Sequence, residues 1–194
     1  VKTAPCIAGI GAHNPAVDLE QIIDEMMVLG FSGITNEPFC GLYGEFFAKQ
    51  LDAAGIGFSR EAELIRTAHH KDIFTVAWAF NAEEARIMAE AGADVIGAIV
   101  GVTSGGLTGA KEVMTLEKAT EEVQVICLAA RDVNPEVFVL THGGPFADAA
   151  TAQYSVAHSD ADGYASGSSG ERMPTEQAVI AITKEYKNIK VNMK

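Results

Sequence analysis

Two side chains capable of acid–base chemistry stand at the ends of short apolar segments. Glu37 follows Asn36 at the end of one such segment, and His142 closes another. A carboxylate can serve as a general base, a metal ligand or a hydrogen-bond acceptor, and an imidazole exchanges protons near neutral pH. Glu37, His142 and Asn36 are therefore the catalytic candidates, and Glu37 is also the candidate metal ligand. The alternatives are a rim salt bridge for Glu37 and a purely structural role for His142.

Glycine pairs that permit close approach of a ligand follow two of the apolar segments. Gly105 and Gly106 lie in a loop of glycines and hydroxyl side chains over residues 100–110, and Gly143 and Gly144 follow a later segment. Exposed backbone amides in such loops can cradle an anion, so we expect these four glycines to bind a ligand. For the first loop, the alternative is a long turn that needs positive φ at its glycines.

A third flexible stretch precedes the last helix of the chain. Gly167, Ser168 and Ser169 combine backbone amides, hydroxyls and the positive end of a helix, which together attract phosphate or carboxylate groups. Arg172 adds a positive charge close by. We expect all four residues to bind the anionic end of a ligand, and the alternative for Arg172 is an ion pair with a neighbouring glutamate, Glu171 or Glu176.

Composition narrows the class of protein and its partners. The 194 residues carry 14 basic and 26 acidic side chains, a formal net charge of −12, which repels nucleic acids and anionic membranes. Three cysteines, Cys6, Cys40 and Cys127, are widely spaced and predicted to be small core residues. The cysteines form no CxxC pair and no even count, so we expect a reducing, cytoplasmic location. No apolar run approaches the length of a membrane span. The candidate anion-binding loops predict a small anionic metabolite as the partner.

The elements that position these residues alternate between apolar strands and helices of period 3.6. Continuous apolar strands indicate a sheet covered on both faces, as in parallel α/β proteins. The predicted strands are residues 6–12, 33–36, 73–80, 95–100, 137–141 and 163–166.

Helix start and stop signals lie between the predicted strands. Asn14 and Pro15 predict the start of the first helix and Gly30 its end, while Asn81 with Glu84 has the spacing of a capping box. The other expected helices are residues 46–54, residues 59–71, one from Thr115 to just before Asn134-Pro135, and one with Pro174 near its first turn.

Two α/β architectures compete. A doubly wound dinucleotide-binding sheet needs phosphate-binding glycines after its first strand, and Gly9-Ile-Gly-Ala-His-Asn14 nearly matches GxGxxG. A (β/α) barrel places polar residues after most strands, because all of its βα loops gather on one face. The polar residues after nearly every strand favour the barrel, although about six strand–helix units are fewer than the eight of a complete one.

Five stretches together resemble one known family. They are residues 30–38, 80–94, 101–111, 142–145 and 163–174. Their order and spacing are similar to those of the phosphoenolpyruvate hydrolase-like TIM-barrel family, which also resembles the C-terminal barrel of plant proteins that confer resistance to tobamoviruses. The resemblance covers nearly the whole chain and implies a single domain over residues 1–194 that lacks the first two strand–helix units of the family barrel.

The resemblance also implies a function. Related phosphoenolpyruvate/pyruvate barrels bind small oxoacids or phosphonates, often with Mg²⁺, so it implies an enzyme that hydrolyses or cleaves such a ligand at the carboxyl-terminal rim. The superfamily's acidic metal-binding signature is not visible in the sequence. The alternative is a non-catalytic barrel, a sensor or protein-interaction domain. An open barrel edge favours a homo-oligomer.

Overall fold

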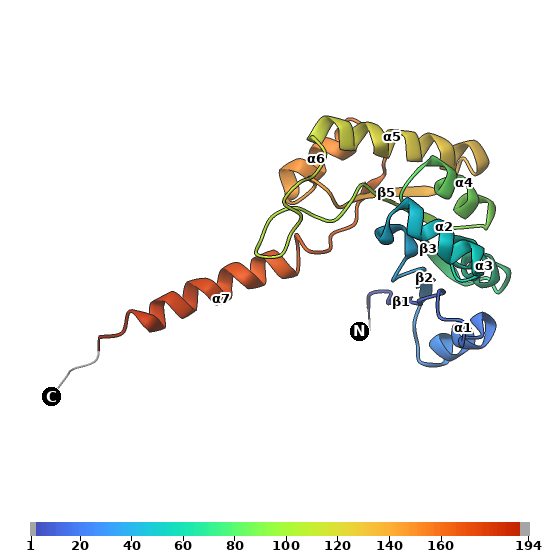
Figure 1. Ribbon diagram of the computed structural model, residues 1–194, viewed down its shortest axis with the longest axis horizontal. Coiled ribbons are helices and arrows are strands. Elements are labelled where there is room, and N and C mark those ends of the chain that lie inside the picture. Colours follow the sequence, from blue (N-terminus) through green and yellow to red (C-terminus); the bar gives the residue numbers. More distant parts are fainter. Residues whose placement is uncertain (1–2, 191–194) are drawn as a thin grey trace.

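Six parallel strands form one sheet in the computed structural model, which describes residues 3–190 (Figure 1). They lie side by side in the order of the sequence, β1-β2-β3-β4-β5-β6. The strands are β1 (Ile7–Gly9), β2 (Gly33–Thr35), β3 (Phe74–Ala79), β4 (Val95–Ile99), β5 (Phe138–His142) and β6 (Gly163–Tyr164). All six predicted strands are therefore present; β5 is shifted by one residue, and the other five are shorter than expected.

This sequential order excludes the doubly wound alternative. A doubly wound sheet reverses its strand order at a switch point, where the dinucleotide binds. Here every strand pairs with its neighbour in the sequence, which is the order of a (β/α) barrel. The glycines after β1 also do not open a helix, because the first helix begins only at Leu19.

Helices follow the strands largely as predicted. They are α1 (Leu19–Val28), the 3₁₀ turn η1 (Cys40–Tyr43), α2 (Glu45–Ala53), α3 (Phe58–His70), α4 (Ala82–Glu90), α5 (Leu116–Val133), α6 (Ala149–Ala157) and α7 (Arg172–Lys187). The predicted start at Asn14 is wrong, because that side chain instead accepts a hydrogen bond from the backbone of Ala16. Asp18 caps α1 by accepting from Gln21, and Gly30 follows the helix with φ of 92° as expected.

The predicted caps of α4 and α5 are confirmed. Asn81 accepts from the backbone amide of Glu84 at 2.9 Å, and Thr115 accepts from Lys118 at 3.3 Å. The Glu84 carboxylate reaches back to the amide of Phe80, one residue before the cap. Asn81 and Thr115 each satisfy a backbone donor that a helix leaves open at its first turn.

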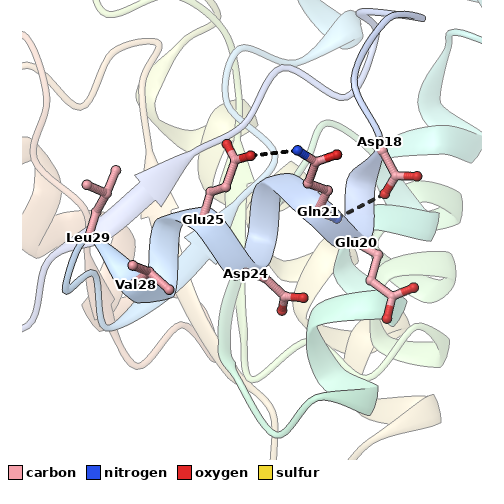
Figure 2. A pocket seen from close by; sticks show the side chains of 7 residues that line it. All are labelled: Asp18, Glu20, Gln21, Asp24, Glu25, Val28 and Leu29. Carbon is pink, nitrogen blue, oxygen red and sulfur yellow. Dashed lines mark hydrogen bonds between the residues drawn. The ribbon is translucent and has the colours of Figure 1, made fainter.

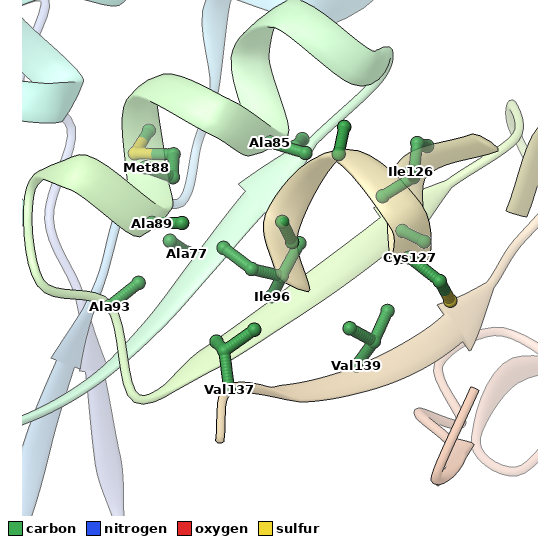
Figure 3. Packing of buried hydrophobic residues seen from close by; sticks show 14 of the residues in the cluster. Ala77, Ala85, Met88, Ala89, Ala93, Ile96, Ile126, Cys127, Val137 and Val139 are labelled. Carbon is green, nitrogen blue, oxygen red and sulfur yellow. The ribbon is translucent and has the colours of Figure 1, made fainter. Parts of the chain in front are cut away.

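The core lies between the sheet and the helices on its outer face (Figure 3). Small side chains on β3 and β4, Ala77, Ala79 and Ala98, let the helices approach closely, and Ile96 and Val139 fill the space between them. Since successive residues of a strand point to opposite faces, the residues between these face the inner, concave side of the sheet. Trp78 and His142 are two of them.

The structure also tests the predictions for the cysteines and for membrane spans. Cys40 and Cys127 are buried, but Cys6 is exposed just before β1, so its assignment to the core is wrong. Burial raises the pKa of both buried thiols to about 12, so neither is a nucleophile near neutral pH. Within residues 3–190, no helix is long and apolar enough to cross a membrane.

Candidate functional site

The carboxyl ends of the strands gather the candidate residues on one rim, as barrel geometry requires. His142 ends β5 and lies against Trp78 of β3, with ring centroids 5.1 Å apart. Trp78 extends across Gly97 of β4, where any side chain would collide with the indole. Phe39, in the loop after β2, packs at 6.2 Å from Trp78. The inner wall of the rim is therefore an aromatic surface with one imidazole in it.

The imidazole of His142 is held in one tautomer. Its Nδ1 lies 2.8 Å from the carbonyl oxygen of Ala165, in the loop after β6. A carbonyl only accepts, so Nδ1 carries the proton, and Nε2 of the neutral ring keeps its lone pair. The structure thus fixes the orientation of His142 through a backbone contact.

The loop after β6 runs past this imidazole. Gly167 packs so closely that a Cβ there would lie 3.1 Å from Cε1 and 3.9 Å from Nε2 of His142. The amides of Gly167, Ser168 and Ser169 donate to no acceptor within the described part of the chain, while the Gly167 carbonyl accepts from Gly170 and Glu171. Gly167 thus lies beside His142 and begins a run of three open amide donors in the turn that precedes α7.

The hydroxyl of Ser169 is already engaged. It lies 2.7 Å from the hydroxyl of Tyr164, which donates to the carbonyl of Phe146 at 2.9 Å. Ser169 must therefore donate its own proton to Tyr164 and can offer a ligand its backbone amide. Ser168 has no such constraint on its side chain within residues 3–190.

Gly143 and Gly144 join two loops. Both are buried with positive φ, and the backbone of Gly144 is bonded at both ends, its amide to Gly101 and its carbonyl to the amide of Ser104. A side chain at Gly143 would collide with the Gly101 carbonyl. These glycines let the loop after β5 pack against the loop after β4. The Gly144 amide already donates to Gly101 and is not free for a ligand.

Arg172 is paired, which was the alternative to anion binding. It donates to Glu176 at 2.8 Å and to the Gly105 carbonyl at 3.1 Å, while the Glu176 carboxylate accepts from the Leu107 amide. The guanidinium lowers the pKa of Glu176, with help from that amide. Because Glu176 pairs with its guanidinium, Arg172 has no unpaired positive charge to offer an anion. Gly105 and Gly106 lie against the start of α7 in the same contact.

Glu37 occupies the other side of the rim, beside β1. It is exposed, and its backbone carbonyl lies over Gly9, where a Cβ would approach that oxygen to 2.8 Å. His13, which the sequence analysis did not select, lies in the loop after β1, with Gly11 between it and Pro38. Its Nδ1 is buried without a hydrogen-bond partner in the described residues. Its place in the polar loop that follows a strand, four residues after β1, was the signal that could have identified it.

Asn36 does not face the rim. It is fully buried on the outer face of the sheet, where its Oδ1 accepts from the Trp78 amide at 2.8 Å and its Nδ2 donates to Glu61 of α3 at 2.6 Å. The other oxygen of Glu61 accepts from the Cys40 amide. A side chain on this face cannot touch a ligand on the inner face, so Asn36 and Glu61 position the loop that carries Glu37.

A Mg²⁺ ion does not fit the residues that the structure brings together. Magnesium requires near-octahedral oxygen ligands, usually one or two carboxylates together with substrate oxygens and water. Within residues 3–190, no three acidic, histidine or cysteine side chains cluster as a metal site would need, and Glu37 stands alone at the rim. We therefore derive no chemistry through a metal.

A hollow on the surface lies away from the rim. It is a shallow groove of about 680 Å³ on the outer face of α1 (Figure 2), and none of the predicted site residues contributes to it. Its lining residues are Asp18, Glu20, Gln21, Asp24, Glu25, Val28 and Leu29. A groove with four carboxylates is a poor site for an anion, so the rim is the better candidate.

Comparison with known proteins agrees with this architecture. The chain is 38% identical over 190 residues to the ToMV susceptible protein tm-1(GCR26) of Solanum lycopersicum, and 37% identical to the ToMV resistance protein Tm-1(GCR237) of the same plant. Each match covers 97% of this chain and 25% of the relative. The chain thus spans about a quarter of the length of these relatives.

The fold is similar to that of a solved barrel enzyme. The crystal structure of 2,3-dimethylmalate lyase, a PEP mutase/isocitrate lyase superfamily member, superposes with a TM-score of 0.50 at 9% identity, covering 82% of this chain and 57% of that chain. This likeness supports the TIM-barrel fold. The model of the phosphoenolpyruvate hydrolase-like family matches residues 1–189, and the chain therefore belongs to that family.

Proposed function

We propose that the rim binds a small phosphorylated or carboxylated oxoacid. The observation that carries this proposal is the position of Gly167 beside His142, at the start of a run of three open amides that continues through Ser168 and Ser169. The amides and the positive end of α7 would hold the anionic group. His142 would then face the carbonyl or enol oxygen of the same ligand, and Trp78 would pack against its apolar part.

Chemistry on such a ligand would use His142 as the acid–base group. Nε2 can take a proton from the ligand, and its protonated form can polarise a carbonyl oxygen, because Nδ1 stays bonded to Ala165. Hydrolysis or cleavage would also require Glu37 to reach the same ligand as a second base. The family match supports this proposal, because the family is described as phosphoenolpyruvate hydrolase-like.

The arrangement of Glu37 also favours a second candidate, a non-catalytic sensor or interaction barrel. β3 and β4 separate Glu37 from His142, about 14 Å measured along the sheet at ordinary strand spacing. A ligand held at His142 would then have no second acid–base group beside it. The names of the tomato relatives, which refer to ToMV resistance and susceptibility, agree with this alternative.

Ligand titration tests the binding site. Phosphoenolpyruvate, phosphonopyruvate, oxaloacetate and inorganic phosphate are titrated with and without Mg²⁺, following the fluorescence of Trp78, the only tryptophan in the chain, and the melting temperature. We expect one oxoacid to bind. His142→Ala should weaken the affinity for that oxoacid at least tenfold, because the hydrogen bond from the imidazole to the ligand is lost. His158→Ala is the matched control, since His158 also bonds a backbone carbonyl through Nδ1 but caps α6.

Equal affinity in the two histidine variants would remove His142 from the site. Turnover of the bound oxoacid then separates the two candidates. Release of phosphate or pyruvate that is lost in Glu37→Gln would support the enzyme, while binding without turnover would support the sensor.

A further inference from the structure

A second groove, of about 600 Å³, is lined by residues of both α2 and α4 (Figure 1). None of the residues assigned to the proposed rim ligand lines this α2–α4 groove. Phe58, Phe80 and Ile87 contribute large apolar side chains to the lining, and all three remain partly exposed. Apolar side chains gathered in a hollow mark a place where another molecule can bury them.

Backbone packing holds both sides of the α2–α4 groove in place. At the end of α2, Asp52 accepts a hydrogen bond from the amide of Ser59 at 2.8 Å, and a side chain at Gly57 would collide with the Asp52 backbone. On the other side, a side chain at Gly41 would collide with the ring of Phe80, so this ring is fixed against η1. The groove is therefore preformed, as binding sites usually are.

Carboxylates surround the apolar lining. Glu45 and Asp52 line the α2–α4 groove from α2, and Glu83 and Glu84 line it from α4. Lys49 also lines it, and its amine pairs with Glu45 at 2.6 Å. Four carboxylates thus face a single amine across this lining. Such an excess of negative charge attracts a cationic partner and repels nucleic acids and anionic membranes.

The groove on the outer face of α1 is acidic too, but its groups have partners within the chain. Lys71 pairs with both Glu20 and Asp24. The helix α1 also buries Leu19 and Ile23 in the core, whereas all nine residues of α2 stay at least partly exposed. The α2–α4 groove therefore combines uncovered apolar surface with an excess of charge, and it is the better docking site.

We propose that the α2–α4 groove binds a basic amphipathic helix of another protein. The apolar face of that helix would lie on Phe58, Phe80 and Ile87, and its lysine or arginine side chains would point to the surrounding carboxylates. Glu45 and Asp52 are seven residues apart, about 10.5 Å along α2, so basic residues one heptad apart would match them. A second copy of this chain, docked about a two-fold axis, would instead bring the same carboxylates together. This surface does not depend on the ligand proposed for the rim.

Charge reversal tests the electrostatic part of the proposal. The probe is a synthetic helical peptide of leucine and lysine, with leucine at the a and d positions, and its binding is measured by isothermal titration calorimetry. We expect it to bind the wild-type chain, and Glu83→Lys to weaken that binding about tenfold or more. Glu90→Lys changes the net charge equally but lies about 10 Å further along α4, where salt screens it, so it should weaken binding less than about twofold. Equal losses in the two variants, or no binding to the wild-type chain, would overturn the proposal.

Filling the groove tests the apolar part. Ala48→Trp places a large side chain in the α2–α4 groove, whereas Gln50→Trp places the same side chain on an exposed position of α2 that does not line it. We expect Ala48→Trp to weaken peptide binding about tenfold and Gln50→Trp to leave it unchanged. Thermal unfolding confirms that each variant is folded.

Two further results would contradict the proposal. A scrambled peptide of the same composition lacks a continuous apolar face and should bind about tenfold more weakly, so equal affinity would mean that no amphipathic helix is recognised. Sedimentation velocity provides the other check. A wild-type dimer that Ala48→Trp dissociates would assign the α2–α4 groove to a second copy of the chain rather than to a basic helix.

Discussion

At the scale of single residues, the most unusual group is the buried carboxylate of Glu61. The orientation of Asn36 is not arbitrary, because its oxygen must accept from the Trp78 amide and its nitrogen must therefore face Glu61. Both oxygens of Glu61 thus receive hydrogen bonds, from Asn36 and from the Cys40 amide. Burial raises the pKa of Glu61, and these two donors oppose that rise without cancelling it.

This raised pKa gives a testable pH dependence. A carboxyl group whose pKa is higher in the folded state stabilises the fold fully below its unfolded pKa of about 4.3, and the contribution is lost as pH rises through the folded pKa. Glu61→Gln removes that titration and leaves one donor without an acceptor, at a cost of about 1–3 kcal/mol. We expect the variant to be less stable, with a deficit that is largest at acid pH and shrinks toward neutral pH.

Urea unfolding between pH 4 and pH 8 measures this deficit directly. Glu63→Gln on the exposed side of the same helix is the control, and its difference from the wild type should not follow the same trend. A deficit of Glu61→Gln that grows with pH would mean that the folded-state pKa is lowered rather than raised.

At the scale of elements, the contact between the β4 and β5 loops decides the shape of the rim. Gly143 has φ of 81° and packs directly on the Gly101 carbonyl, so it combines a backbone conformation suited to glycine with a space that admits no side chain. Gly55 also has positive φ, 74°, but its side-chain position opens to empty space. A side chain at Gly55 would therefore meet only the cost of positive φ, whereas a side chain at Gly143 would meet that cost and a steric clash.

Alanine substitutions use this difference. Gly55→Ala should cost only the backbone penalty of about 1–2 kcal/mol. Gly143→Ala should cost about 1–3 kcal/mol more, because the loop of Gly101 must also move. Thermal unfolding of both variants measures the gap, and equal losses would show that the two loops separate easily. If the rim binds an oxoacid, Gly143→Ala should also weaken the binding of that oxoacid, because His142 is the preceding residue.

At the scale of the whole molecule, one core holds the six units together. Ile96 of β4 is fully buried among side chains of α4 and α5 (Figure 3), and it lies near the centre of the sheet. The inner face is less covered, since Phe74 and Phe138 are 45% and 60% exposed. In a complete barrel such side chains form interior layers, whereas in this six-stranded sheet β1 and β6 are edge strands.

A single truncation should show how strongly the body depends on this core. Ile96→Ala should lower the free energy of unfolding by about 2–5 kcal/mol, because it leaves a cavity in a packed interior. Leu128→Ala, at a side chain that is 57% exposed, should change it by less than about 1 kcal/mol. Urea unfolding of both variants provides the comparison. Similar losses would mean that α5 is covered on its outer side as well.

Much of the fold could be read from the sequence, since its signals are local. The caps at Asn81 and Thr115, the glycine after α1 and the alternation of strands with helices depend on residues within a few positions of one another. The placement of His142 on the rim followed from the same pattern, because a residue at the carboxyl end of a strand must lie there in a barrel. The error at Asn14 is of the same local kind, since Asp18 offers an equally good cap four residues later.

Only the tertiary structure decided what the candidate residues touch. Asn36 and Glu37 are adjacent, yet one is locked behind the sheet by Glu61 and the other lies exposed on the rim. Arg172 and Glu176 form an ion pair on α7, and each also bonds to the backbone of the loop at Gly105–Leu107. These contacts join segments that are almost seventy residues apart in the sequence. Such contacts depend on how helices pack on the sheet, and nothing in the local pattern encodes them. The sequence by itself therefore determined the order of the elements and the rim, while packing across the sheet selected which rim residues are free to meet a ligand.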